Sequence, residues 1–347
     1  TPKALALAGP QNLKDVSCAS EKVCIMATGT NTLVSTTDGG DAGILVAPSQ
    51  STLNTASFAT GTRIAALGAL GATSISDDAG ATFRTVGGRL AGTYNAMIAG
   101  PANVAFAPGD NGGLARTNDG GQSWVRGSVA TSEDVRGVSF PSATDGFALD
   151  VAGGLFRTGD GGATWRALDI GTTARPSAVE ASSAQVVVIG GPRGVRRSVD
   201  SGDTFSAVKG SINKSQLTDV DAAGSALFAF GSQDVWRSTD KGKTWTTVLK
   251  PGKYKKAKNG KKVNRKVVRH VDFVSANNGY LLDDNGFVYR TSNGGKSWTS
   301  LLATGSDQGY GMAFSSSSRG YLIVDEFGST DAGFLLRTTD SGKTWTP

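Results

Sequence analysis

An all-β fold made of repeated four-stranded units is the class that this sequence predicts, on three observations. A short motif recurs at a nearly constant interval, each unit reads as four short strands, and no window shows a sustained helical period. Glycine accounts for 48 of the 347 residues, which suits a chain with many tight turns. Four-stranded units repeated around an axis form a β-propeller, so we predict a single propeller domain over residues 1–347.

The repeated motif has the pattern Ser/Thr-x-Asp/Asn-x-Gly-x-Ser/Thr-Trp/Phe. Its copies lie near residues 36–43, 76–83, 117–124, 158–165, 198–205, 238–245, 291–298 and 338–345. Their third positions are Asp38, Asp78, Asp119, Asp160, Asp200, Asp240, Asn293 and Asp340. In such a motif the carboxylate or amide caps nearby backbone N–H groups, and the following glycine supplies positive φ. We interpret each copy as a turn between the third and fourth strands of its unit, with a structural role for its carboxylate.

The unit that ends in the fourth motif illustrates the four strands, which we place at residues 135–141, 146–151, 153–158 and 164–168. Eight motifs predict eight four-stranded blades, with seven as the alternative. The segment Lys3–Ala8 belongs to no unit of its own. Because an unpaired edge would leave backbone groups unsatisfied, we expect Lys3–Ala8 to close the ring beside residues 334–338 in the last blade.

The motif resembles the Asp-box, or BNR repeat, of sialidase-type propellers. The unit from Asp134 to Trp165 is similar to units of photosystem II assembly and stability factor-like propellers, and the resemblance runs from about residue 12 to residue 347. These families include glycosidases and non-enzymatic assembly factors, so the resemblance implies the fold rather than one activity. It also implies that function lies on the face with the loops between second and third strands and the connections between units.

A strongly basic segment lies on that face, where the motif spacing stretches from 40 to 53 residues. Residues 250–270 hold ten Lys and Arg residues of a chain with net charge +6, so the rest of the chain carries −4. Such a segment can attract an acidic polymer, peptide or protein, or it can be a solvated loop. The partner-binding candidates are Lys253, Lys255, Lys256, Lys258, Lys261, Lys262, Arg265 and Lys266.

Carboxylates on the same face are the candidate catalytic groups. They are Asp283, Asp284, Asp325 and Glu326. Two carboxylates at a suitable separation can hydrolyse a glycosidic bond, and oxygen ligands can also bind Ca²⁺, but aspartate is common in turns for structural reasons. We therefore assign no residue to catalysis, and we expect no metal and no cofactor. His270, the only histidine, is expected to be structural.

Six arginines stand directly before motif copies and are therefore part of the repeat: Arg116, Arg157, Arg197, Arg237, Arg290 and Arg337. Arg175, Arg193 and Arg196 form the only arginine cluster outside that pattern. Neither set makes the arginine triad that the sialidase resemblance would require. A sialidase is therefore not the expected function.

The two cysteines, Cys18 and Cys24, lie on either side of a predicted tight turn. No second Cys pair completes a zinc site, so we predict a disulfide and hence an exported protein, secreted, periplasmic or on the cell surface. No apolar run is long enough for a transmembrane helix. The sequence thus predicts an exported monomeric binding or assembly scaffold, with a protein, peptide or anionic polymer rather than nucleic acid as partner. A polysaccharide-acting glycoside hydrolase is the alternative.

Overall fold

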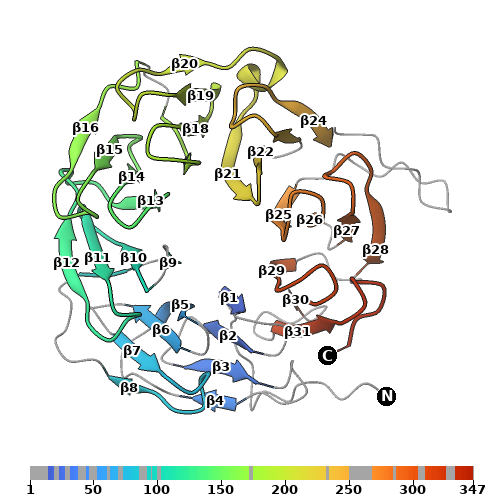
Figure 1. Cartoon of the computed structure of the whole chain (residues 1–347). Coiled ribbons are helices and arrows are strands. Elements are labelled where there is room, and N and C mark those ends of the chain that lie inside the picture. The colour runs from blue at the N-terminus through green and yellow to red at the C-terminus, as the bar shows by residue number, and fades with distance from the viewer. Residues whose placement is uncertain are drawn as a thin grey trace.

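The computed structural model describes most of the chain. The described residues are 15–18, 23–27, 32–37, 44–46, 53–60, 63–68, 73–85, 92–94, 96–99, 103–171, 175–231, 234–249, 268–283, 287–303, 309–325 and 333–346. They form antiparallel sheets that follow one another in sequence order around a central axis (Figure 1). This arrangement is a β-propeller, as predicted.

Each sheet has its first strand nearest the axis. The inner strands are β1 (Asp15–Cys18), β5 (Leu53–Thr60), β9 (Ile98–Ala99), β13 (Val135–Ser139), β17 (Ala178–Ala181), β21 (Leu217–Ala223), β25 (Val268–Phe273) and β29 (Gly309–Phe314). The second strands are β2 (Cys24–Ala27), β6 (Arg63–Gly68), β10 (Ala105–Pro108), β14 (Gly146–Asp150), β18 (Val187–Gly191), β22 (Ala226–Gly231), β26 (Gly279–Asp283) and β30 (Gly320–Asp325).

The outer half of each sheet carries the repeated turn. The third strands are β3 (Leu33–Thr36), β7 (Thr73–Ser76), β11 (Gly113–Thr117), β15 (Leu155–Thr158), β19 (Gly194–Ser198), β23 (Val235–Ser238), β27 (Phe287–Thr291) and β31 (Gly333–Thr338). The outer strands are β4 (Ile44–Val46), β8 (Arg84–Thr85), β12 (Val125–Ser128), β16 (Arg166–Leu168), β20 (Ser206–Ala207), β24 (Thr246–Leu249) and β28 (Thr299–Ala303). A short 3₁₀ helix, η2 (Ser211–Lys214), follows β20.

We number the sheets 1 to 8 along the chain. Seven of them have four strands among the described residues, and sheet 8, β29 to β31, has three. The described strands therefore make seven complete four-stranded blades, which matches the alternative prediction of seven and not the expected eight. In sheet 8, Thr346 is the one described residue at the position of the fourth strand. Thr346 forms an isolated bridge with Arg337 of β31. Sheet 1 lies beside sheet 8 (Figure 1), while the predicted pairing of Lys3–Ala8 falls outside the described residues.

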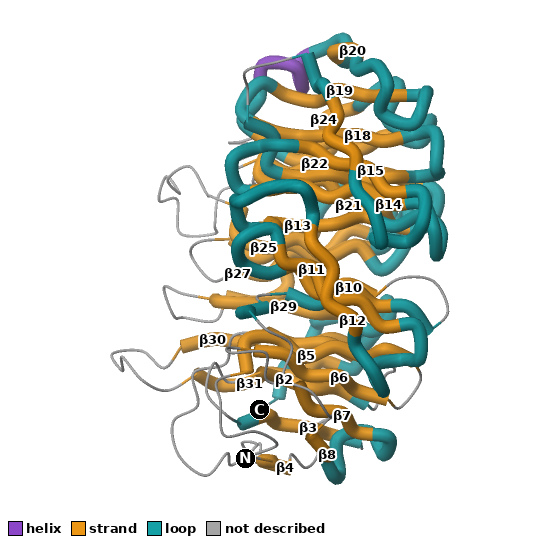
Figure 2. Tube along the Cα trace, turned by 90° about the vertical axis from the view of Figure 1, so that its left-hand side faces the viewer, coloured by secondary structure: helices purple, strands orange, loops and turns teal. Residues whose placement is uncertain are grey.

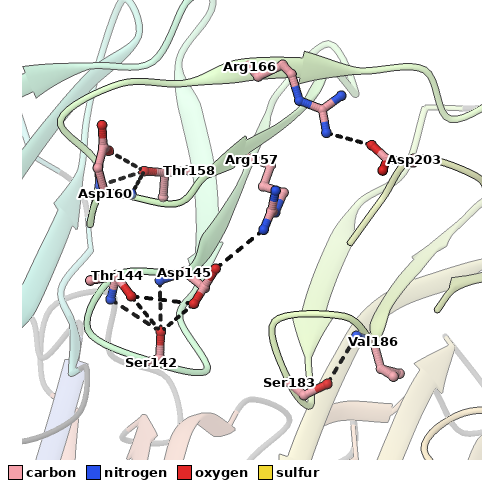
Figure 3. A network of polar contacts seen from close by, with 11 residues as sticks. Ser142, Thr144, Asp145, Arg157, Thr158, Asp160, Arg166, Ser183, Val186 and Asp203 are labelled. Carbon is pink, nitrogen blue, oxygen red and sulfur yellow. Dashed lines mark hydrogen bonds and ion pairs between the residues drawn. The ribbon is translucent and has the colours of Figure 1, made fainter. Parts of the chain in front are cut away.

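The repeated motif forms the turn after the third strand, as expected, and we call it the repeat turn. In the fifth copy the Ser198 hydroxyl donates to Asp200 at 2.7 Å and accepts from the Gly202 N–H at 2.8 Å. The backbone and hydroxyl of Thr204 donate to the two oxygens of Asp200 at 3.0 and 2.6 Å. The glycine bond recurs in all seven copies whose contacts the structure describes, and Figure 3 shows Thr158 and Asp160 of the fourth copy.

Aromatic stacking joins neighbouring sheets. A ring on the second strand of one sheet stacks on a phenylalanine at the end of the next inner strand, with centroids 3.3–3.5 Å apart: Phe106 on Phe140, Phe228 on Phe273 and Tyr280 on Phe314. The first residue of the following second strand is a glycine in each case. A Cβ at Gly146 would lie 2.2 Å from the Phe140 ring, so the ring position requires glycine there.

The alternation of strand direction sorts the loops into two faces. Repeat turns and the loops between first and second strands share one face, while the loops between second and third strands share the other with the connections between sheets. We call the latter the connection face. Helix η2 lies on it, on the side away from the repeat turns in Figure 2.

Candidate functional site

The repeat-turn carboxylates are used within their own turns. Hydrogen bonds from Thr204, led by its side-chain hydroxyl, lower the pKa of Asp200 to about 2. The same bonds occupy both oxygens of the carboxylate, which leaves it in a capping role. The arginines before the turns also have local partners: Arg116 and Arg237 donate to carbonyls of the next sheet, and Arg157 pairs with Asp145 (Figure 3).

Of the four carboxylates expected on the connection face, the structure describes the side chain of Asp283. It is fully buried, and it accepts hydrogen bonds from the Phe287 N–H at 3.0 Å and the Tyr289 hydroxyl at 3.1 Å. Asp150 occupies the matching place in sheet 4 and caps the same loop through the Gly154 N–H at 2.7 Å. Asp283 therefore stabilises a turn. Asp284 and Glu326, and the side chain of Asp325, lie outside the described residues.

The basic segment also lies outside the described residues, which resume at Val268. His270 follows on β25, and burial lowers its pKa while a hydrogen bond with the Met312 backbone opposes that shift. A desolvated imidazole that contacts the next sheet fits the predicted structural role. The described residues contain no group of three or more His, Cys, Asp or Glu side chains placed to hold a metal ion.

Inner strands contribute a ring of residues to the central channel. The ring residues occupy one register position, each paired with the second residue of the next strand, or with the third in sheets 2 and 6, where that strand begins one residue earlier: Ser17, Ser57, Ile98, Ser139, Glu180, Asp221, Asp272 and Ala313. Three neighbouring sheets, 5 to 7, thus place carboxylates at the same level. Asp219 adds a fourth one two residues before Asp221 on β21.

Hydrogen bonds link this ring from sheet to sheet. Ser139 donates to Glu180 at 3.2 Å and accepts from the Ala181 N–H at 2.9 Å, which joins sheets 4 and 5. Asp272 accepts from the Phe314 N–H at 2.6 Å, which joins sheets 7 and 8. A cavity of about 360 Å³ lies among Ile98, Glu180, Asp219, Asp221 and their neighbours.

The channel carboxylates hold protons more tightly than ordinary side chains. Burial, followed by repulsion from Asp221, raises the pKa of Glu180 to about 8. Burial also raises the pKa of Asp219 and of Asp272 to about 6. The side chains of Asp219 and Asp221 are accessible to water in the channel, yet protein surrounds them on most sides, and this costs the charged form hydration.

A second cavity, of about 910 Å³, opens on the connection face at the junction of sheets 4 and 5. We call it the junction pocket. Its charged lining residues are Arg193, Arg196, Lys214 and Asp169, so the pocket carries an excess of positive charge. The sequence singled out Arg193 and Arg196 as non-repeat arginines. It did not indicate that they share a cavity, and Arg175 lies beside it, next to the lining residue Pro176.

Neither cluster was predicted as a site from the sequence, although signals for each exist. Aligning the inner strands by the repeat places Glu180, Asp221 and Asp272 in one column, where Ser139 and Ala313 also stand. The same alignment of third strands places Arg196 in a column otherwise occupied by apolar or small residues. Both clusters could therefore have been found in the sequence as positions where one or more units have a charged residue and the aligned positions of other units do not.

The two cysteines lie directly opposite each other, because Cys18 pairs with Cys24 in the β1–β2 register. Cα atoms of directly paired antiparallel residues lie within the range that a disulfide spans. The Cys18 side chain lies outside the described residues, so the disulfide stays a prediction. In the described part of the chain, no helix is long and apolar enough to cross a membrane.

Comparison with known proteins supports the propeller class. The family model described as sortilin, neurotensin receptor 3, matches residues 233–347, a third of the chain. A structure of YCF48 bound to the D1 peptide aligns with a TM-score of 0.60 at 17% identity, covering 84% of this chain and 95% of that one. YCF48 from Cyanidioschyzon merolae aligns with a TM-score of 0.55 at 15% identity, covering 97% and 98%.

An enzyme also shares the fold. An ancestral GH74 enzyme aligns with a TM-score of 0.59 at 13% identity, covering all of this chain and 56% of that one. No curated protein matches the sequence. At these identities the likeness is one of fold, so the chain is a β-propeller similar to YCF48 and to GH74-type propellers, and its function must be argued from its own residues.

Proposed function

We propose that this protein is an exported, non-enzymatic binding or assembly scaffold that recognises an acidic segment of a protein or peptide partner. The observation that carries the proposal is the junction pocket, where Arg193, Arg196 and Lys214 line a cavity of about 910 Å³ on the connection face. Ligand sites are typically cavities of this size in which apolar residues and a few charged groups form the lining, and the junction pocket has such a lining. Its cationic groups suit carboxylates.

Two further features support this function. Among the described residues, Asp200 is bonded within its repeat turn, and Arg197 and Arg237 donate to carbonyls of the next sheet, which favours a structural role for the repeat turns over a ligand-binding one. The basic segment that includes Lys253–Lys262 would enlarge the positive surface on the connection face and accelerate encounter with an acidic partner. A YCF48 propeller has a peptide bound, which is consistent with peptide recognition by this fold.

The proposal includes the finer sequence-based expectations. The repeat turn is an Asp-box, the protein acts as a monomer, and Cys18 and Cys24 form a disulfide in an oxidising compartment. The disulfide closes a short loop, so it should contribute on the order of 2 kcal/mol to stability. A thiol assay on the unreduced native protein should find no reactive sulfhydryl, and two reactive sulfhydryls would contradict export with an intact disulfide.

Titration of the full chain with synthetic peptides tests the main function. A glutamate-rich peptide should bind, and its affinity should fall steeply with salt as paired charges release counterions. A lysine-rich peptide of the same length is the control for non-specific binding and for attraction to the channel carboxylates. Equal or tighter binding of the lysine-rich peptide would contradict the proposal.

A polysaccharide-acting glycoside hydrolase is the second candidate, and the channel carboxylates favour it. Glu180, with a pKa of about 8, is protonated near neutral pH, whereas Asp219 and Asp272, at about 6, are largely ionised. An acid beside a base is the pairing that glycoside hydrolysis requires. A chromogenic glycoside screen tests it: turnover that Glu180→Gln abolishes would favour the enzyme, and no turnover by the wild type would exclude it for the substrates screened.

A further inference from the structure

Arg196 departs from the repeat at a position that packs neighbouring sheets together. It pairs with Ile189 in the β18–β19 register, and the same register position holds Phe156, Trp236 and Tyr289 in sheets 4, 6 and 7. Those three side chains belong to the apolar clusters between their own sheet and the preceding one. Trp236, for example, is 2% exposed between sheets 5 and 6.

The junction pocket lies where an aromatic side chain at position 196 would pack. Its walls come from the connection after β16, the second strand β18, the loop between β18 and β19, and helix η2. Arg196 is held from its own sheet, because its guanidinium donates to the Phe205 carbonyl at 3.0 Å. Where sheets 4, 6 and 7 have an aromatic side chain, sheet 5 thus has an arginine held by its own sheet, which places a positive charge beside the cavity.

The charges around this space are arranged for an anion. Arg193, in the loop between β18 and β19, and Lys214, at the end of η2, are both exposed at the rim. Asp169 is the one carboxylate among the lining residues, so the three cations leave an excess of two positive charges. Guanidinium groups bind carboxylates through two parallel hydrogen bonds, which gives recognition as well as attraction.

We propose that the junction pocket is a specific site for a carboxylate-bearing polypeptide segment, with Arg196 as its inner anchor and Arg193 and Lys214 at its rim. The proposal rests on the scaffold function above and names the residues and the ligand class. A single small anion would occupy little of about 910 Å³, whereas several residues of an acidic chain would fill it. Apolar lining from Pro176, Ile189 and Ala207 can pack against the aliphatic parts of such a segment.

The test uses a fluorescein-labelled octaglutamate peptide and the full chain, with binding followed by fluorescence anisotropy. Arg196→Trp restores the residue type of sheet 6 and should fill the pocket. It should weaken binding about tenfold or more, because it removes both the space and a paired charge, while the melting temperature is unchanged or higher. Wild-type affinity in a folded Arg196→Trp protein would overturn the site.

Matched charge reversals separate the pocket from the overall charge. Arg193→Glu with Lys214→Glu should weaken binding more than Lys243→Glu with Lys296→Glu, which makes the same change in net charge on the repeat-turn face. Equal effects of the two pairs would overturn the proposal. The comparison is repeated with the six lysines of segment 253–262 replaced by glutamine, so that the basic segment does not mask the pocket.

Inorganic phosphate distinguishes a polypeptide site from a general anion site. At constant ionic strength, phosphate should displace the peptide only at concentrations far above that of the peptide. Displacement at equal concentration would overturn the assignment to a polypeptide. A peptide that binds the wild type and every pocket variant alike would leave the scaffold function standing and remove the junction pocket from it.

Discussion

At the scale of single residues, one Asp or Asn side chain caps the backbone in each repeat turn that the structure describes. Asp240 accepts from the Thr244 N–H at 2.8 Å and from the Thr244 hydroxyl at 2.6 Å. Asn293 makes the equivalent backbone contact in sheet 7, so an amide can replace the carboxylate. These bonds lie within seven residues of sequence, and that is why the sequence predicted the repeat turns and their structural role.

Replacing Asp240 should therefore have graded effects. Asp240→Ala leaves the Thr244 N–H and the turn uncapped, and should lower the free energy of unfolding by about 1–2 kcal/mol. Asp240→Asn keeps the acceptor and should cost less. Chemical denaturation of both variants measures the difference, and equal losses would show that hydrogen bonding is not the origin of the effect.

The channel carboxylates give stability a dependence on pH. Their pKa values in the folded state, about 8 for Glu180 and about 6 for Asp219 and Asp272, lie above those of the unfolded chain. The folded state therefore binds more protons between pH 4 and 8, and the free energy of unfolding should fall as pH rises through that window.

Glu180→Gln tests this origin, because glutamine keeps an acceptor for Ser139 and cannot ionise. The variant should lose part of the decline in stability between about pH 6 and 8, while His270 and the repeat turns contribute equally to both proteins. Denaturation curves at several pH values measure the decline. An identical decline in wild type and variant would contradict the assignment to Glu180.

At the scale of elements, the inner strands and the third strands differ in how far the sequence could predict them. Gly146, Gly279 and Gly320 begin the second strands of sheets 4, 7 and 8, where a Cβ atom would lie within 2.4 Å of a phenylalanine ring. Because this glycine and its phenylalanine recur in three units, they can be seen by aligning the units. Glu180 and Arg196 depart from the repeat, and their meaning depends on which residues of other sheets they face, which no local pattern reports.

The basic segment can be tested as an element of its own. Deletion of residues 253–262 should remove most of the retention on an anionic matrix and reduce its dependence on salt, because six lysines are lost. The melting temperature should stay nearly unchanged, since a connection between sheets is shortened. Unaltered retention would assign the segment to a solvated linker.

At the scale of the whole molecule, the ring brings the first and last sheets together, with β1 beside β29 (Figure 1). Thr346 pairs with Arg337 at the place where a fourth strand of sheet 8 would begin. Arg166 of the fourth strand pairs with Arg157 in the same way in sheet 4. We propose that Lys3–Ala8 completes that edge. Unpaired strand edges expose backbone groups, so closure of the ring is a natural place for an added strand.

Removal of residues 1–8 should then lower the free energy of unfolding by several kcal/mol, since a strand and the closure of the ring are lost together. Thermal and denaturant unfolding of the truncated and full-length chains compare the two. A truncated protein that melts like the full chain would refute this closure.

The central claim is that the connection face binds an acidic segment at the junction of sheets 4 and 5, and hydrogen–deuterium exchange tests it most directly. In the full chain with saturating octaglutamate peptide, amides of residues 190–194 and of η2 should exchange more slowly, while the repeat turns on the opposite face should not change. Protection confined to the repeat turns, or protection elsewhere with none in residues 190–194 and 211–214, would contradict the account.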